Sequence, residues 1–306
     1  MKKSRIIASV VVLAIAGSLF ISPVQTFAVN AMSVFRMSDP YVINISAQDL
    51  TEIAQNIQSL INGKQDSDEC TDSAPQNKET MHDMRQHETI LSSASDFKAF
   101  PFSLPAYFKD QAPTIKEIDL PAATIDIDTA KVNERLAELQ SPVALPASLD
   151  GRQVTVNPSP MIVAEYPDAV CFAAQKPSYD LPGGMDSLIT QAVATLPLLT
   201  DDIRSQLGNI NLFDNNIYLP NVEGVTKTAE LGRNTGYIYT VNDVMSLADN
   251  LSSTLQSGQD QPSGAIQKLQ EYAGYEVILW VSNGTLYGVL GKYSDDQLAA
   301  IAKSME

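Results

Sequence analysis

The feature that most restricts the fold is the dipeptide Asn283-Gly284 near the C-terminus, which separates two apolar segments. Both residues tolerate the positive φ angles of a type I′ turn, so the dipeptide is a strong signal for a β-hairpin. The flanking segments, Glu276–Ser282 and Thr285–Lys292, are rich in β-branched and aromatic residues. Trp280 and Tyr287 stand on either side of the turn, and we expect them to meet across the strands.

A helix is predicted directly after this hairpin. Ser294 and Gln297 have the spacing of a capping box, in which each side chain bonds the backbone amide of the other residue. Apolar residues at helical spacing follow as a buried face: Leu298, Ile301, Ala302 and Met305.

The rest of the chain alternates strand and helix patterns. Hydroxyl residues at Ser46 and Thr200 are suited to cap two further helices, and Leu181-Pro182-Gly183-Gly184 breaks the chain before a third. A short helix is expected over Ala130–Leu139 and another over Val244–Leu255. Strands are predicted at Tyr41–Ile45, Ala123–Asp128, Arg152–Val156, Met161–Tyr166, Val170–Ala174, Ile217–Val222 and Tyr237–Val241. We therefore expect an α+β fold in which helices cover an antiparallel sheet.

The N-terminus has the pattern of an export signal. Lys2, Lys3 and Arg5 precede an uncharged segment whose apolar part runs from Ile6 to Val24. The small-x-small site Thr26-Phe27-Ala28 follows, so residues 1–28 fit a signal peptide cleaved after Ala28. The same segment also fits an uncleaved membrane anchor at the short end of the length that spans a bilayer. In either case the positive charges of Lys2, Lys3 and Arg5 keep the N-terminus in the cytoplasm, and the bulk of the chain lies outside it.

Composition limits the class of partner. The chain has 306 residues, of which 44% are hydrophobic, enough to bury a core. Its formal net charge is −16, and such a surface repels nucleic acids and anionic lipid headgroups. We expect a strand–helix segment over residues 29–63, an acidic flexible linker over 64–88 and an α+β globular domain over 89–306. Residues 64–86 are polar, acidic and almost free of large aliphatic side chains.

The two cysteines offer one disulfide. Cys70 lies in the acidic linker, whereas Cys171 lies in an apolar strand, where a small buried side chain is the simpler interpretation. Outside the cytoplasm the two are able to pair, which would tie the linker to the core.

Two groups of residues are candidates for a metal site. Met81, His82, Met84 and His87 fall in one short polar run, and thioether and imidazole ligands together suit copper. A solvated linker explains the same residues without a metal. Asp126 and Asp128 are predicted on one face of a strand, where they are suited to bind a cation or to act as acid and base, although a solvated strand face is the simpler interpretation. The acidic pairs Asp201-Asp202 and Asp295-Asp296 sit at helix starts, where they complement the helix dipole.

The pattern around the hairpin resembles a known family. The run from Ile278 to Gly291, followed by Ser294-x-x-x-Leu298-x-x-Ile301-Ala302, resembles a bacterial domain of unknown function that forms the extracytoplasmic end of membrane-anchored anti-sigma-factor-like proteins. The segments Pro160–Tyr166 and Leu196–Leu207 are similar too. The resemblance implies a lipoprotein-carrier-like half-barrel, a curved antiparallel sheet with helices on or in its concave face, and it transfers no catalytic residues. Only Met1–Arg5 precede the apolar segment, so we do not expect the cytoplasmic sigma-binding part.

These observations favour a non-catalytic extracytoplasmic binding or sensor domain that engages a protein partner or an apolar ligand and uses no cofactor. The membrane would be contacted only through an uncleaved N-terminal helix. Trp280 and Tyr287 are candidates for the wall of a ligand site, although a place in the core is the simpler interpretation. Three alternatives stay open: a lipid or lipoprotein carrier, a metal-dependent hydrolase using Asp126, Asp128 or the histidines, and a copper-binding protein.

Overall fold

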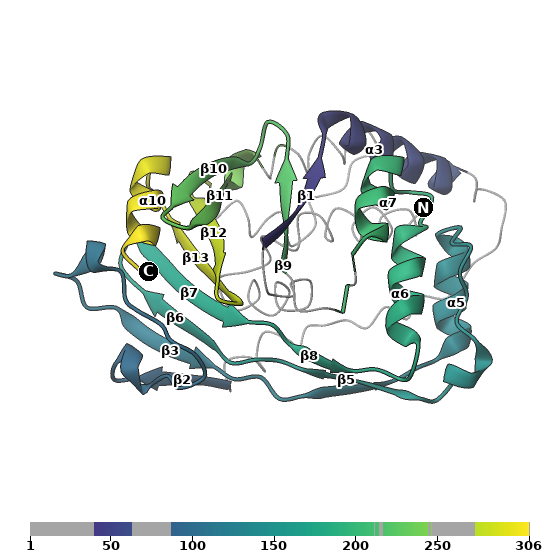
Figure 1. Ribbon diagram of the computed structural model, residues 1–306, viewed down its shortest axis with the longest axis horizontal. Helices are drawn as coiled ribbons and strands as arrows, with labels where there is room; N and C mark the ends of the chain where they lie inside the picture. Colours follow the sequence, from purple (N-terminus) through teal and green to yellow (C-terminus); the bar gives the residue numbers. More distant parts are fainter. Residues whose placement is uncertain are drawn as a thin grey trace.

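The computed structural model describes residues 40–62, 87–210, 212–213, 217–243, 246 and 273–305. Its largest element is an eight-stranded antiparallel sheet that is open at both edges (Figure 1). Its strands, in spatial order, are β10 (Lys227–Leu231), β11 (Asn234–Thr240), β12 (Glu276–Ser282), β13 (Thr285–Gly291), β7 (Ala169–Gln175), β6 (Met161–Glu165), β3 (Thr114–Ile118) and β2 (Glu88–Leu91). The predicted α+β class, with a large antiparallel sheet, is confirmed.

The predicted hairpin is formed by β12 and β13. Asn283 and Gly284 adopt φ angles of 49° and 72°, as a type I′ turn requires. Trp280 pairs directly with Tyr287, and their rings stack at a centroid distance of 5.4 Å. On its other side β13 pairs along its whole length with β7, so the hairpin joins the two halves of the sheet.

Beside the large sheet lies a narrower three-stranded ribbon formed by β4 (Ala123–Asp126), β5 (Gln153–Asn157) and β8 (Ser178–Asp180). In the chain, β4 follows β3, β5 precedes β6 and β8 follows β7, so the ribbon continues these three strands of the sheet. The register is kept across the break. Ile118 pairs with Met161 and Ala123 pairs with Val156, an advance of five residues on each strand. Each of the three connections across the break contains proline: Pro121 between β3 and β4, Pro158 and Pro160 between β5 and β6, and Pro177 between β7 and β8. Because proline has no amide hydrogen to donate, pairing stops there without a change of register.

One face of the large sheet is covered by α10 (Asp295–Lys303), which Ser294 and Gln297 cap as predicted. Its buried side chains pack against Ile278 and Trp280, and its last turn also contacts the short helix Ala106–Phe108. The segment that ends in this short helix extends over the same face. There Phe97 and Phe100 are buried against Ile162 and Ala173.

The opposite face, on the inside of the curve, is covered by β9 (Ile217–Val222) (Figure 1). Ile217 and Leu219 are fully buried and belong to one apolar cluster with Met161, Phe172 and Leu279. β1 (Pro40–Ile45) pairs with β9 in parallel. Among the described residues this strand pair, rather than a helix, therefore contacts the face on which helices were expected.

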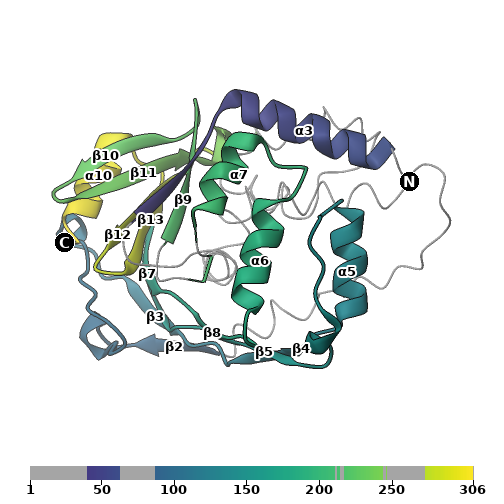
Figure 2. The same cartoon turned by 45° about the vertical axis from the view of Figure 1, so that its right-hand side comes forward.

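The described α-helices other than α10 form a further layer beyond β1 and β9 (Figure 2). α3 (Ala47–Asn62) and α7 (Asp201–Gly208) share an apolar cluster with Ile45 of β1 and Val222 of β9. α6 (Met185–Ala194) joins a second cluster with Val154 of β5, at the far end of the ribbon. α5 (Thr129–Glu138) also lies at that end (Figure 2).

The predicted strands differ from the observed strands in two ways. The prediction missed β2, β3, β8 and β10, which are three to five residues long. It also extended a strand to Asp128, whereas β4 ends at Asp126 and Asp128 caps α5. The leader at 1–28, almost all of the linker at 64–88 and most of the helix expected over Val244–Leu255 lie outside the described residues. Glu88, the last residue assigned to that linker, is the first residue of β2.

Candidate functional site

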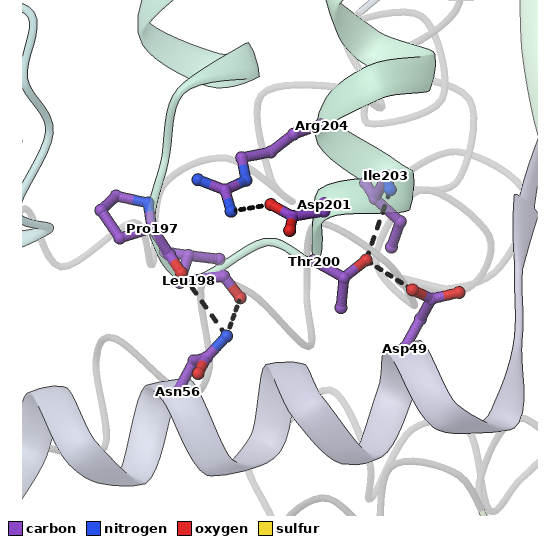
Figure 3. Close-up of polar contacts among 8 residues, drawn as sticks. All are labelled: Asp49, Asn56, Pro197, Leu198, Thr200, Asp201, Ile203 and Arg204. Carbon is purple, nitrogen blue, oxygen red and sulfur yellow. Dashed lines mark hydrogen bonds and ion pairs between the residues drawn. The ribbon is translucent and has the colours of Figure 1, made fainter.

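The most connected buried polar group lies where α3 meets α7 (Figure 3). The Asp49 carboxylate accepts hydrogen bonds from the Ser46 amide at 2.8 Å and from the Ser46 hydroxyl at 2.6 Å. Its other oxygen accepts a hydrogen bond from the Thr200 hydroxyl, which in turn accepts from the Ile203 amide. One carboxylate therefore connects the N-termini of two helices that are 151 residues apart in the chain.

Side-chain amides strengthen the same junction. The Gln206 side chain of α7 forms two hydrogen bonds with the backbone of Asn44 in β1. The Asn44 backbone amide donates to Gln206 Oε1 at 2.8 Å, and Gln206 Nε2 donates to the Asn44 backbone carbonyl at 2.9 Å. Asn56 of α3 donates to the Leu198 carbonyl at 3.4 Å (Figure 3). Segment 40–62 is thus held to the remainder of the chain by polar contacts as well as by its apolar face.

The charge state of Asp49 follows from these bonds. Burial disfavours the ionised carboxylate, but the hydrogen bonds from Ser46 and Thr200 favour it more strongly and lower the pKa of Asp49. The positive ends of two helix dipoles act in the same direction. Asp49 is therefore a structural anion at neutral pH.

Replacing Asp49 by asparagine is expected to lower the free energy of unfolding at pH 7 by about 0.5–2 kcal/mol, the range for loss of a helix cap. Because its pKa is lower in the folded chain, the stabilisation is complete above the ordinary value of 3.8 and is lost as the pH falls through the folded pKa. Urea unfolding at pH 7 and pH 3 measures the effect. The difference between wild type and D49N should shrink at pH 3. D202N removes only the helix-dipole interaction of an exposed first-turn aspartate of α7, so it should lose less stability at pH 7 than D49N does. An equal difference at both pH values would contradict this role for Asp49.

A second cluster of titratable side chains, Lys227, Glu276 and Asp295, lies where α10 meets β10 and β12. Lys227 Nζ is 2.9 Å from an Asp295 carboxylate oxygen. Burial, together with a hydrogen bond and repulsion from Asp295, raises the pKa of Glu276. Burial opposes ionisation of Asp295 too, but its bonds to Lys227 and Glu276 outweigh that effect and lower its pKa. The arrangement therefore separates two carboxyl groups into an ionised Asp295 and a more easily protonated Glu276.

The two ligand-wall candidates lie in the sheet. Trp280 is 1% exposed and packs under α10, so it belongs to the core. Tyr287 is partly buried, and its hydroxyl donates to the Pro101 carbonyl at 3.3 Å. The structure brings these two side chains together, with α10 and the segment that contains Pro101 packed around them.

The structure describes only some of the metal candidates. Met81, His82 and Met84 lie outside the described residues, and His87 stands just before β2. Asp126 and Asp128 do not share a strand face, because Asp128 turns away to accept the Lys131 amide at 3.0 Å as the cap of α5. In the described part of the chain no three His, Cys, Asp or Glu side chains gather closely enough to hold a metal ion.

Cys171 has no disulfide partner among the described residues and is fully buried beneath α10. This burial raises the pKa of the thiol to about 12. Cys70 lies outside the described residues, so its pairing with Cys171 stays a prediction. Such a bond would require the acidic segment to enter the core between the sheet and α10.

The comparisons with known proteins add no assignment. No family model matches the chain, no curated protein is significantly similar to it, and no solved structure matches its fold. Within the described ranges, none of the helices has the length and apolar character needed to cross a membrane.

Proposed function

We propose that the protein is a non-catalytic extracytoplasmic binding or sensor domain, held at the membrane or secreted, that engages a protein partner. The supporting observation is how its buried polar side chains are used. Apart from aromatic residues, four polar side chains of the described residues are almost completely buried, and each of the four bonds another residue of the fold. Asp49 and Thr200 bond each other, Thr129 donates to Asp150 at 2.9 Å, and Thr285 accepts from Gln175 at 3.4 Å. This pattern suits a rigid scaffold that acts through its surface.

The N-terminal segment supports the tethered form of this proposal. β1 begins at Pro40, shortly after the proposed leader, and pairs with β9 over six residues. α3 then packs on α7 through Leu50 and Ile53. A membrane anchor at residues 1–28 would thus be attached to the folded scaffold through a short connection. The mass of the mature protein separates the two forms, since a chain that starts at Val29 has lost its anchor.

A lipid or lipoprotein carrier is the second candidate. The inner face of the sheet is apolar, as such a carrier requires, but Ile217 and Leu219 of β9 occupy it. An acyl chain would have to displace β9, together with the β1 strand that pairs with it. This observation favours the protein-partner form of the proposal.

Native mass spectrometry of the full chain, extracted gently from its cell envelope, tests the proposed function. We expect a complex heavier than the bare chain by the mass of a protein. Because the chain carries a net charge of −16, the partner should be basic and should dissociate as salt is raised. A bound lipid would support the carrier instead, and a bare chain at low salt would contradict both.

A further inference from the structure

Among the described residues, the outer edge of the ribbon at β4 has backbone groups that pair with no strand. Along β3, the neighbouring position is taken by β2, whose pairing extends to a hydrogen bond of 3.1 Å from the Asp119 amide to the His87 carbonyl. β4 follows β3 along the chain, so the place that β2 takes beside β3 extends, past this bond, along the outer edge of β4. There, β5 is the only strand among the described residues that pairs with β4.

The direction of the free groups follows from one hydrogen bond. The Ile127 amide donates to the Arg152 carbonyl at 2.8 Å, so the backbone of Ile127 faces β5. Backbone groups alternate along an antiparallel strand, which places those of Ile125 toward β5 and those of Thr124 and Asp126 toward the open side. The side chains agree with this assignment. Thr124 and Thr155 hydroxyls lie 3.0 Å apart, as expected for a closely spaced, non-hydrogen-bonded pair.

This edge lacks most of the features that protect sheet edges. Residues 121–126 are all exposed, and the Ile125 side chain is 62% exposed. β4 is short, but it contains no lysine and no proline, and no described element covers it. In contrast, the edge strand β10 starts with Lys227, which is paired with Asp295, and it contacts α10. Exposed edges of this kind accept an added strand from another chain.

The charges near β4 select the type of strand. Asp119 and Asp126 are exposed near its two ends, and β4 carries no basic residue. A residue of an added strand that stands opposite Asp126 shares its face, so lysine or arginine is favoured there. The next position along would stand opposite Ile125, where an apolar residue is favoured. A second copy of this acidic chain is disfavoured by repulsion.

We propose that the β4 edge binds an extended segment of a basic protein partner, with alternating apolar and cationic side chains, by adding it as a strand. This inference rests on the proposed function and names the partner class and the docking edge. The added strand would lie end to end with β2 and pair with the free backbone groups of Thr124 and Asp126. In the free protein these two amides should exchange with solvent quickly.

Hydrogen exchange at single-residue resolution tests the proposal on the full chain in detergent. The probe is a capped peptide in which lysine and valine alternate, and the control peptide replaces lysine by glutamate. At ten times its dissociation constant, the basic peptide should slow exchange at Thr124 and Asp126 about tenfold. Exchange at Ile125 should not change, because its amide already faces β5. The glutamate peptide should have no effect.

Three variants sharpen the test. T124P removes one outward amide, which an edge strand tolerates, and should abolish the protection at Asp126. T124V keeps the amide and should bind like wild type. I90K changes an isoleucine of β2 that is 73% exposed, outside the proposed position, and should also bind like wild type.

Several outcomes would overturn the proposal. They are an absence of protection by the peptide, protection of both amides already in the free protein, equal binding of the two peptides, or protection that grows with protein concentration alone, which would indicate a second copy. Native mass spectrometry with the natural partner distinguishes a wrong docking edge from a wrong proposed function. If T124P retains the partner mass in native mass spectrometry, the edge is wrong while the function stands. If wild type has no partner, the function itself is wrong.

Discussion

Replacing Gly288 by valine should destabilise the protein more than any exposed substitution. The ring of Phe172 on β7 lies directly over Gly288 of β13, its cross-strand partner. A Cβ atom at residue 288 would lie 2.1 Å from Phe172 Cζ, well inside van der Waals contact. Because both strands are central in the sheet, neither backbone has room to move aside. We expect G288V to lower the free energy of unfolding by about 3 kcal/mol or more, the upper range for overpacking, as measured by urea denaturation.

A second substitution tests the cause of this loss. F172L shortens the side chain over residue 288 and by itself should cost less, because the cavity it leaves is small. In the double variant, the clash is relieved, so the two losses should sum to more than the measured one. If the losses simply add, the contact between Phe172 and residue 288 is not the reason for the glycine.

The Trp280→Ala substitution should have an effect of similar size. Trp280 is 1% exposed, stacks on Tyr287 and packs under Leu298 and Ile301 of α10. Loss of a buried tryptophan typically costs about 3–5 kcal/mol. Trp280 is the single tryptophan of the chain, so unfolding of W280A is followed by circular dichroism rather than by fluorescence.

The same experiment decides between the two sequence-based interpretations of Trp280. W280F keeps an aromatic ring against Tyr287 and should lose clearly less stability than W280A, with partner binding unchanged. Should W280A unfold at the wild-type urea concentration while its bound partner or lipid is lost, Trp280 would be a ligand wall and its place in the core would be energetically unimportant.

The elements that sequence analysis located correctly are those with a local chemical signal. Asn283-Gly284 specifies its own turn, and Ser294 and Gln297 cap their helix within one turn of the chain. Thr200 was likewise recognised as a helix cap and has that role. In each case, the residues that interact lie within a few positions of one another, so spacing alone is enough to identify them.

What the sequence did not reveal depends on contacts between distant segments. Ser46, Asp49 and Thr200 have the spacing expected of helix caps, but nothing local indicates that Thr200 donates to Asp49. Strands as short as β8 have too few residues to display an alternating pattern, and pairing with β5 is what makes them extended. The open edge at β4 was hidden for the same reason, since a strand carries no mark of having one neighbour instead of two.

The parallel pairing of β1 with β9 has a consequence for the order in which the chain can fold. Tyr41 lies opposite Tyr218, so the first strand leaves the ribosome 177 residues before its partner does. Closing so long a loop is entropically costly, and local hairpins such as β6–β7 form without this cost. We therefore expect the segment 40–62 to stay unpaired while the centre of the sheet assembles, and its docking through Asp49 to be among the last steps. An N-terminal anchor would keep this late-docking strand beside the membrane throughout that interval, where its unsatisfied backbone is available to chaperones.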